Sequence, residues 1–372
     1  MRPNRTPYSL RSTASVALPA IAFLVTACSS SPPGRTSDAL AVPDTVRVVE
    51  VKYFPIRGES IDREVTGDWG ESLDSTRHKV DAISELLRTS LTEGTRYHGY
   101  ADSTAGPSLV YEILDAYEFL DPLPTEPVVG SNPPMTDYAA VLDRMDARTW
   151  IDDRSVDEVW IWGYHGGKIG LWESNMSSPF EDVSNSDRRE DDLPVYSRTY
   201  TVYHYNYQRG AAEAMENHMH QLEALLNHFD GRDDAPPESW PNLLFWGKFV
   251  GSDSTHRLTE PIRAGWSHYP PNALHDYEWA NDSVVQSDIR DWTPDGTGRR
   301  KETTCSLWGC DHRGWFIFWM QNIPGRNSGL SVDGRPLRNW WTFVSDPDGA
   351  FQEHRRLWID APQESFPDGP RK

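Results

Sequence analysis

The chain has 372 residues and carries 56 acidic against 36 basic side chains, which gives a net charge of −20 at pH 7. Such a surface repels phosphate backbones, and no basic stripe with interleaved aromatic residues offsets it, so we expect no nucleic acid as a partner. The length fits one large domain or two closely packed ones.

The N-terminus has the layout of an export signal. Arginines precede a mostly apolar run at residues 16–25, which is too short for a membrane span of about 20 residues. The run ends at Val25-Thr26-Ala27-Cys28, which resembles a bacterial lipobox and implies that residues 1–27 are a lipoprotein signal peptide and that Cys28 carries lipid. An ordinary signal peptide with a chance cysteine is the alternative. The sequence therefore predicts a cell-envelope protein, lipid-anchored to the membrane and facing outward from the cytoplasm.

Regular elements are expected from residue 45 onward. Residues 28–44 are rich in Ser and Pro and predict a flexible tether. In residues 45–235, strands alternate with helices: strands at 45–54, 108–120, 156–163 and 199–207, helices at 77–91, 137–148 and 208–229. This order predicts an α/β fold with a mainly parallel sheet flanked by helices. Loops at 55–58, 164–176 and 206–210 would then lie beyond the carboxyl ends of strands, where sites gather.

The rest of the chain is rich in tryptophan. Eleven of the 16 tryptophans lie between Trp240 and Trp358, in short apolar pieces separated by Pro, Gly and Asp. We expect residues 236–372 to form an irregular, loop-rich region packed over the sheet, in which large aromatic side chains either fill a core or stack on sugars.

The chain has three cysteines, and lipidation of Cys28 would leave Cys305 and Cys310. In an oxidising compartment they are expected to form a disulfide that staples a local turn. A metal site is the alternative, with His312 and Asp311 as the nearby groups that could complete it.

The helix expected at 208–229 carries a polar stripe beside its apolar one. At 100° per residue, four polar side chains share an arc about 80° wide: Glu213, Glu216, His220 and Glu223. Glu216 and His220 have the one-turn spacing with which the His-Glu-x-x-His helix of zincins offers two ligands to one ion. Asn217 stands where the catalytic glutamate would be, so another acid, Glu223 or Glu213, must activate the water. Glu223 could instead be a fourth ligand. A solvated Glu–His pair is the alternative.

A second cluster begins at His268-Tyr269-Pro270-Pro271-Asn272 and continues to Trp279. Two prolines stiffen its backbone without making it helix or strand, as a ligand-bearing loop requires. His268 is the predicted third ligand, with Asp276 behind it. A purely structural loop, in which Asn and Asp cap turns and His268 bonds a carbonyl, is the alternative.

Two further residues are candidates for catalysis. Glu173 follows the third strand and could act as an acid or base. Arg209, together with Glu213, is expected to orient the substrate or the ligands. The sequence has no Gly-x-Ser-x-Gly motif and no cysteine suited to catalysis, which argues against serine- or thiol-based acyl transfer.

Parts of the chain resemble an uncharacterised family of large secreted bacterial proteins. The resemblance covers about residues 157–343 and rests on the Arg-Gly…Glu-x-x-x-His-x-x-Glu helix, the His-x-Pro-Pro-Asn loop and Asn339-Trp340-Trp341. It implies an extracellular protein and no particular activity. The family has a cysteine shortly before the residue matching His268, where this chain has Ala264, so the Cys305–Cys310 pair would be a local variant.

These features favour a metal-dependent hydrolase of extracellular peptide or glycan. Zinc or another divalent ion would be bound by Glu216, His220 and His268. One alternative is a glycan-handling protein that uses tryptophans such as Trp172 and Trp279, and paired carboxylates such as Glu173 with Glu216. The other is a non-catalytic surface protein in which the polar clusters are structural.

Overall fold

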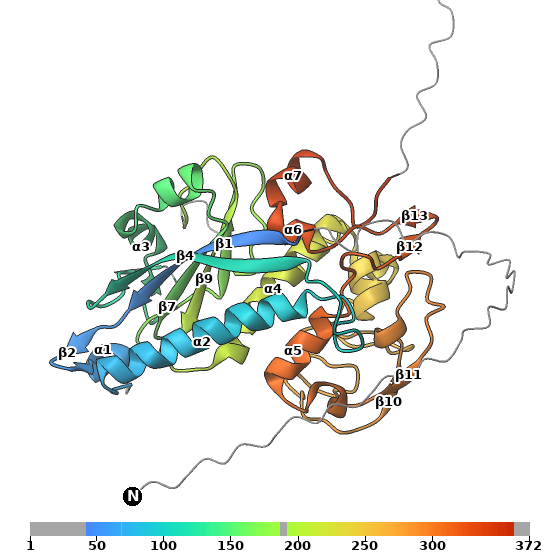
Figure 1. The fold of residues 1–372 in the computed structure, drawn as a ribbon, viewed down its shortest axis with the longest axis horizontal. Helices are drawn as coiled ribbons and strands as arrows, with labels where there is room; N and C mark the ends of the chain where they lie inside the picture. Colours follow the sequence, from blue (N-terminus) through green and yellow to red (C-terminus); the bar gives the residue numbers. More distant parts are fainter. Residues whose placement is uncertain (1–41, 68, 129, 187–191, 361–372) are drawn as a thin grey trace, which may run out of the picture. The chain divides into compact units, whose positions relative to one another are not determined.

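The computed structural model describes residues 42–67, 69–128, 130–186 and 192–360, which belong to one compact unit (Figure 1). The predicted signal peptide, the lipidation site Cys28 and nearly all of the tether lie outside the described residues. Within the described ranges, no helix is long and apolar enough to cross a membrane.

A five-stranded sheet forms the centre of the fold, and it confirms the predicted α/β class with a mainly parallel sheet. The strands stand in the order β4 (Leu109–Phe119), β1 (Asp44–Tyr53), β7 (Glu158–Gly163), β9 (Tyr200–Asn206) and β8 (Ser174–Ser177). β4, β1, β7 and β9 are parallel, whereas β8 is antiparallel to β9. The four predicted strands are present, but β8 was expected to be loop, because its four residues lack an apolar alternation.

Helices cover both faces of this sheet. α2 (Leu73–Gly94) and α4 (Ala211–Phe229) lie side by side on one face (Figure 1). Tyr205 of β9 points to this face, where its Oη lies 2.7 Å from Nε2 of His218 in α4. The neighbouring His204 points to the other face and bonds Tyr138 of α3 (Tyr138–Arg144). Because successive side chains of a strand point to opposite faces of the sheet, α3 and α4 lie on opposite faces. The helices predicted at 137–148 and 208–229 are shorter than expected.

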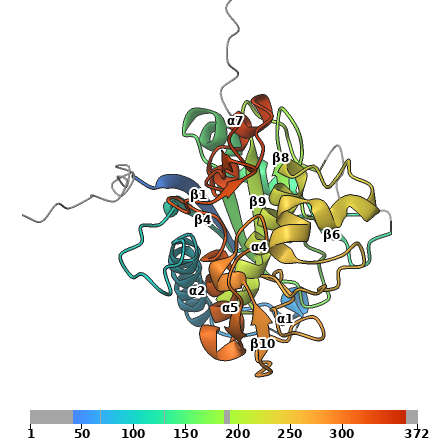
Figure 2. The same ribbon diagram turned by 90° about the vertical axis from the view of Figure 1, so that its right-hand side faces the viewer.

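Residues 236–360 form the predicted tryptophan-rich, irregular region. Its longest helix is α5 (His312–Met320), which packs against both α2 and α4 (Figure 2). Trp315, Trp319 and Trp340 are fully buried, so these tryptophans form a core where few regular elements exist. The predicted disulfide between Cys305 and Cys310 is confirmed, and it closes the turn that leads into α5.

The remaining elements are short. The strands are β2 (Ile56–Arg57), β3 (Ser60–Ile61), β5 (Thr125–Glu126), β6 (Met135–Thr136), β10 (Val285–Ser287), β11 (Lys301–Thr303), β12 (Ser331–Val332) and β13 (Arg335–Pro336). The helices are α1 (Arg63–Thr66), α6 (Thr342–Ser345) and α7 (Pro347–Gln352). Short 3₁₀- or π-helical segments lie at Thr149–Asp153, Pro237–Asn242, Leu244–Val250, Ile289–Asp291 and Cys305–Trp308.

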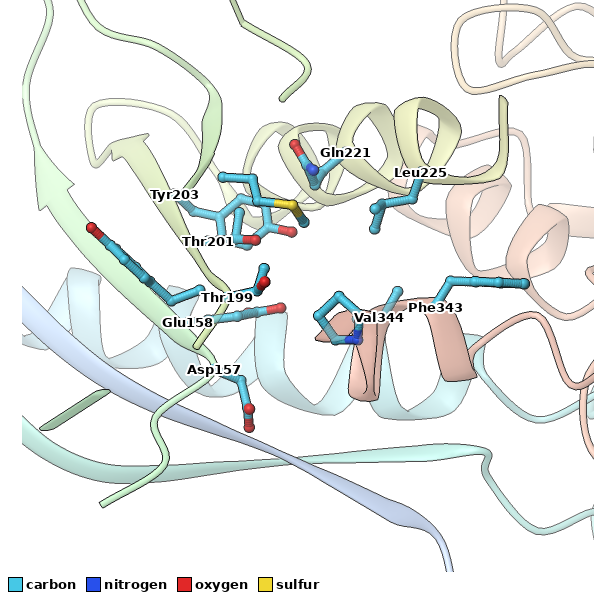
Figure 3. Close-up of a pocket in the computed structure, with 12 residues that line it drawn as sticks. Asp157, Glu158, Thr199, Thr201, Tyr203, Gln221, Leu225, Phe343 and Val344 are labelled. Carbon is cyan, nitrogen blue, oxygen red and sulfur yellow. The ribbon is translucent and has the colours of Figure 1, made fainter. Parts of the chain in front are cut away.

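A small cavity of about 20 Å³ with polar and apolar walls lies between the sheet, α4 and α6, with room for roughly one water molecule (Figure 3). Glu158 is a wall residue and is almost fully buried. Its carboxyl accepts a hydrogen bond from Nε1 of Trp160 (2.7 Å). Burial nevertheless raises the pKa of Glu158 to about 8, so this side chain carries a proton at neutral pH.

Candidate metal centre

Helix α4 presents two of the three predicted ligands. Glu216 and His220 stand one turn apart, so both side chains leave the helix on the same side. Asn217, next to Glu216, donates through Nδ2 to the carbonyl oxygens of His204 (3.0 Å) and Glu173 (3.1 Å). Asn217 stands where a zincin has its catalytic glutamate. Here it holds the backbone of Glu173 against α4.

The third predicted ligand, His268, lies on an irregular loop that tryptophans hold in place. The carbonyl oxygen of the preceding Ser267 accepts hydrogen bonds from Nε1 of Trp315 (2.9 Å) and of Trp279 (3.3 Å). Ser267 is itself fully buried. A loop without helix or strand partners needs such donors for its buried carbonyls, and here the indoles supply them.

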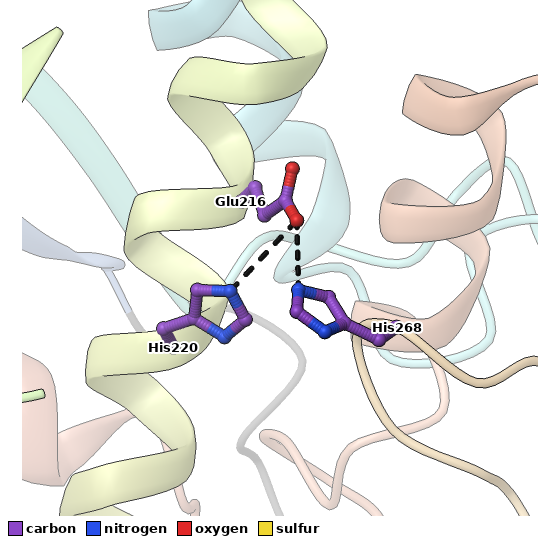
Figure 4. A group of neighbouring side chains, drawn as sticks. All are labelled: Glu216, His220 and His268. Atoms are coloured by element: carbon purple, nitrogen blue, oxygen red, sulfur yellow. Dashed lines mark hydrogen bonds and ion pairs between the residues drawn. The ribbon is translucent and has the colours of Figure 1, made fainter. Parts of the chain in front are cut away.

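Glu216, His220 and His268 come together as predicted. One ligand atom of each lies within 4.8 Å of the others, and both imidazoles are directed toward the Glu216 carboxylate (Figure 4). Oε1 of Glu216 is 2.8 Å from Nε2 of His268 and 3.8 Å from Nε2 of His220. Ligand atoms about 2.0 to 2.2 Å from a tetrahedral ion lie about 3.3 to 3.6 Å apart. The two separations bracket that span, so small side-chain rotations would admit a divalent ion.

The other nitrogen of each imidazole faces a carboxylate. Nδ1 of His220 lies 3.5 Å from Oε2 of Glu223 and 3.3 Å from Oγ of Ser267. Nδ1 of His268 lies 4.0 Å from Oδ1 of Asp276. Carboxylates behind metal-binding histidines fix the tautomer and the ring orientation that leave Nε2 free to bind an ion.

His312 also belongs to this cluster, whereas the sequence had named it only as a possible ligand beside Cys305 and Cys310, which the disulfide excludes. Its Nε2 lies 3.5 Å from Oε2 of Glu216, and its ring stacks on Trp279 with 3.5 Å between centroids. This nitrogen is buried and has no hydrogen-bond partner among the described atoms. Because His312 begins α5, directly after the disulfide turn, its place beside Glu216 depends on long-range packing that no sequence spacing reveals.

The charges in the cluster support one another. Burial opposes ionisation of Glu216, but the hydrogen bond from His268 and the neighbouring imidazoles of His312 and His220 lower its pKa to about 2. Burial likewise opposes protonation of His220, but the carboxylates around it, Glu223 foremost, raise its pKa above the ordinary value. The carboxylates thus concentrate negative charge around the imidazoles, and such an environment also attracts a cation.

A cavity of about 830 Å³ opens beside the cluster. It lies beyond the carboxyl ends of β7 and β9 and reaches the N-terminal end of α4, which is where sites form in such sheets. Its walls are His165, Leu171, Trp172, Glu173, Asn185, Ser186, His204, Tyr205, Asn206, Arg209, Gly210, Glu213, Ala214, Glu216, Asn217, Tyr277, Trp279 and His312. This volume is typical of pockets that bind small molecules or short polymer segments.

Three of the four predicted catalytic residues lie on the cavity wall, and the fourth does not. Glu173, Arg209 and Glu213 line the cavity. Oε2 of Glu213 accepts a hydrogen bond from the backbone N–H of Gly210 (3.1 Å), so this side chain also caps α4. Glu223 lies away from the cavity wall, behind His220, and its Oε1 accepts from the backbone N–H of Ser267 (2.7 Å).

The chain matches no protein-family model, and no curated protein matches it. The resemblance to a secreted bacterial family stays a prediction. The functional argument therefore rests on the geometry of this site.

Proposed function

We propose that this chain is a metal-dependent hydrolase of the bacterial cell envelope, whose ion is bound by Glu216, His220 and His268. The observation that carries the proposal is the convergence of these three side chains, two from a helix and one from a loop 48 residues after His220, beside a cavity of about 830 Å³. Peptide and glycan are the polymers that an envelope enzyme meets.

The donor set fits a catalytic divalent ion such as zinc. Two imidazoles and one carboxylate leave coordination positions open, and Glu216 stands on the cavity wall, so those positions would face the substrate. A bound ion of this kind would acidify a water molecule and polarise the substrate carbonyl. Three protein ligands backed by Glu223 and Asp276 are the arrangement that such sites use.

Glu173 is the best placed general base. Its Oε2 lies 4.0 Å from Nε2 of His220, on the cavity side of the cluster, and Asn185 donates to it (3.3 Å). Glu173 would take a proton from the attacking water and pass it to the leaving group. Glu223, which we expected as a ligand or base, is assigned here to positioning His220, since it faces away from the cavity.

The envelope location is part of the proposal. Cys28 would carry the lipid, and the Ser/Pro-rich segment that follows would hold the enzyme off the membrane. The disulfide between Cys305 and Cys310 supports this location, because such bonds persist in oxidising compartments outside the cytoplasm.

The test is the metal content of protein purified without chelators. We expect close to one divalent ion per chain in the wild type and less than about 0.2 in Glu216→Gln, His220→Ala and His268→Ala, because each removes one of three ligands. His275→Ala is the matched control, since His275 is an exposed histidine of the same loop outside the cluster. Less than about 0.2 ion in the wild type, or wild-type content in the ligand variants, would contradict the proposal.

Glycan binding without a metal is a second candidate, favoured by the two tryptophans on the cavity wall. Trp172 stacks on Tyr138 and Trp279 stacks on His312, which leaves at most one face of each indole for a sugar. Glycan binding that persists in the presence of a chelator and is lost in Trp172→Ala and Trp279→Ala would favour this candidate over the hydrolase.

A further inference from the structure

Arg209 is an exposed arginine on the wall of the large cavity. Within the part of the chain that the structure describes, no carboxylate forms an ion pair with its guanidinium. Among the described wall residues of this cavity, which include three glutamates and three histidines, Arg209 is the one arginine or lysine. An arginine fork offers two parallel N–H groups, which suits a carboxylate of a ligand.

The guanidinium lies within electrostatic reach of the proposed metal centre. Burial and the carboxylate of Glu216 are the main causes that raise the pKa of Tyr277, and Asp276 and Glu173 add to them, whereas Arg209 lowers it. Tyr277 in turn contacts the His268 ring, with 4.3 Å between centroids. Arg209 and Glu216 line the same cavity, so one bound molecule could touch both Arg209 and the ion.

The backbone around Arg209 also favours a negative charge. Arg209 directly precedes α4, a helix of 19 residues whose N-cap is Gly210, and glycine has no side chain that could cap the first N–H groups. The positive end of the helix dipole is thus at the cavity, partly balanced by Glu213.

The length of α4 between its N-terminal end and Glu216 indicates how far a negatively charged ligand group would lie from the bond that is hydrolysed. Gly210, the N-cap of α4, precedes Glu216 by six residues, which is about 9 Å along the helix. An extended peptide spans about 3.3 to 3.6 Å per residue. The rise from this N-cap, which directly follows Arg209, to Glu216 therefore corresponds to two or three residues of an extended peptide.

We propose that Arg209 and the N-terminal end of α4 form a subsite for the free C-terminal carboxylate of a peptide, and that the bond two or three residues before that carboxylate is hydrolysed. This inference rests on the proposed function. In the reaction the oxygen of one water molecule bonds to the peptide carbonyl carbon, the C–N bond breaks, and the leaving nitrogen takes a proton. No oxidant or reductant is needed.

The experiment compares two pools of N-acetylated tetrapeptides, one with free C-terminal carboxylates and one with C-terminal amides. The metal-loaded wild type should cleave the acids with a kcat/KM about tenfold or more above that for the amides, as expected for a charge-assisted bidentate contact. In Arg209→Gln the ratio of kcat/KM for acids to that for amides should fall toward one. Arg257→Gln, an exposed arginine outside the cavity, should retain it. Equal rates on acids and amides, or a preference that survives Arg209→Gln, would overturn the subsite.

Binding separates this inference from the hydrolase itself. Equilibrium dialysis of both pools against the His220→Ala variant, read by mass spectrometry, measures carboxylate preference in a protein without the intact ligand set. Preferential binding of the acids without cleavage by the wild type would support the subsite and contradict the hydrolase. Equal binding of acids and amides to His220→Ala would overturn the subsite whatever the wild type cleaves.

Discussion

Glu223 illustrates how single residues define this centre. It shares the polar stripe of α4 with the two ligands, yet its carboxylate is bound by the backbone N–H and the hydroxyl of Ser267 and stands behind His220. Its contribution is to orient one imidazole and to join the helix to the loop that carries His268.

We therefore predict that Glu223→Gln weakens metal binding about 10- to 100-fold without removing a ligand, because the partner behind His220 loses its charge. Competition with a chromogenic chelator measures the dissociation constant. Glu181→Gln, an exposed acid whose carboxylate lies beside His228 and not beside the cluster, is the control. An unchanged dissociation constant in Glu223→Gln would show that His220 needs no carboxylate behind it.

At the scale of elements, β7 carries a buried acid that ties the stability of the sheet to pH. The folded-state pKa of Glu158 is about 8, against an ordinary value of 4.5. A raised pKa means that the folded state binds the proton more tightly than the unfolded state. The stabilisation is complete below pH 4.5 and is lost as the pH rises through about 8.

Glu158→Gln should therefore flatten the dependence of unfolding free energy on pH between 5.5 and 8, since glutamine stays neutral and can still accept the hydrogen bond from Trp160. Urea denaturation at both pH values measures this. Asp230, whose pKa burial raises to about 7, leaves a residual slope in the variant. Glu59→Gln, at an exposed site, should keep the wild-type slope. If Glu158→Gln also kept it, Glu158 would be ionised in the folded protein.

The sequence predicted the elements whose side-chain pattern is local. The one-turn spacing of Glu216 and His220 follows from helix geometry, and the prolines after His268 indicated a stiff loop, so three ligands could be chosen. β8 was missed because its four residues have no strand pattern of their own and depend on β9 for pairing. His312 was not predicted at this centre because only the packing of α5 against α4 brings it to Glu216.

At the scale of the whole molecule, the tryptophan-rich half and the sheet contribute different parts of one site. The sheet and α4 supply Glu173, Glu216 and His220, whereas His268 and His312 come from the irregular half. An ion bound by both halves would link them and stabilise the folded chain. Nothing in the sequence spacing between the halves predicts this, since it depends on which loop packs over the end of α4.

Removal of the ion should accordingly lower the stability of the entire unit. At a free metal concentration of 100 times the dissociation constant, binding contributes about 3 kcal/mol to the unfolding free energy. Thermal denaturation with and without a chelator measures the loss. The chelator should leave the melting temperature of His220→Ala unchanged, and an equal decrease in that variant would mean that it acts elsewhere.

Anomalous diffraction from crystals grown with zinc tests the central claim most directly. We predict one strong peak about 2.0 to 2.2 Å from Nε2 of His220, Nε2 of His268 and a carboxylate oxygen of Glu216, facing the large cavity. Crystals with no peak among these three side chains, or with zinc bound only at other residues, would contradict the metal centre and the hydrolase built on it.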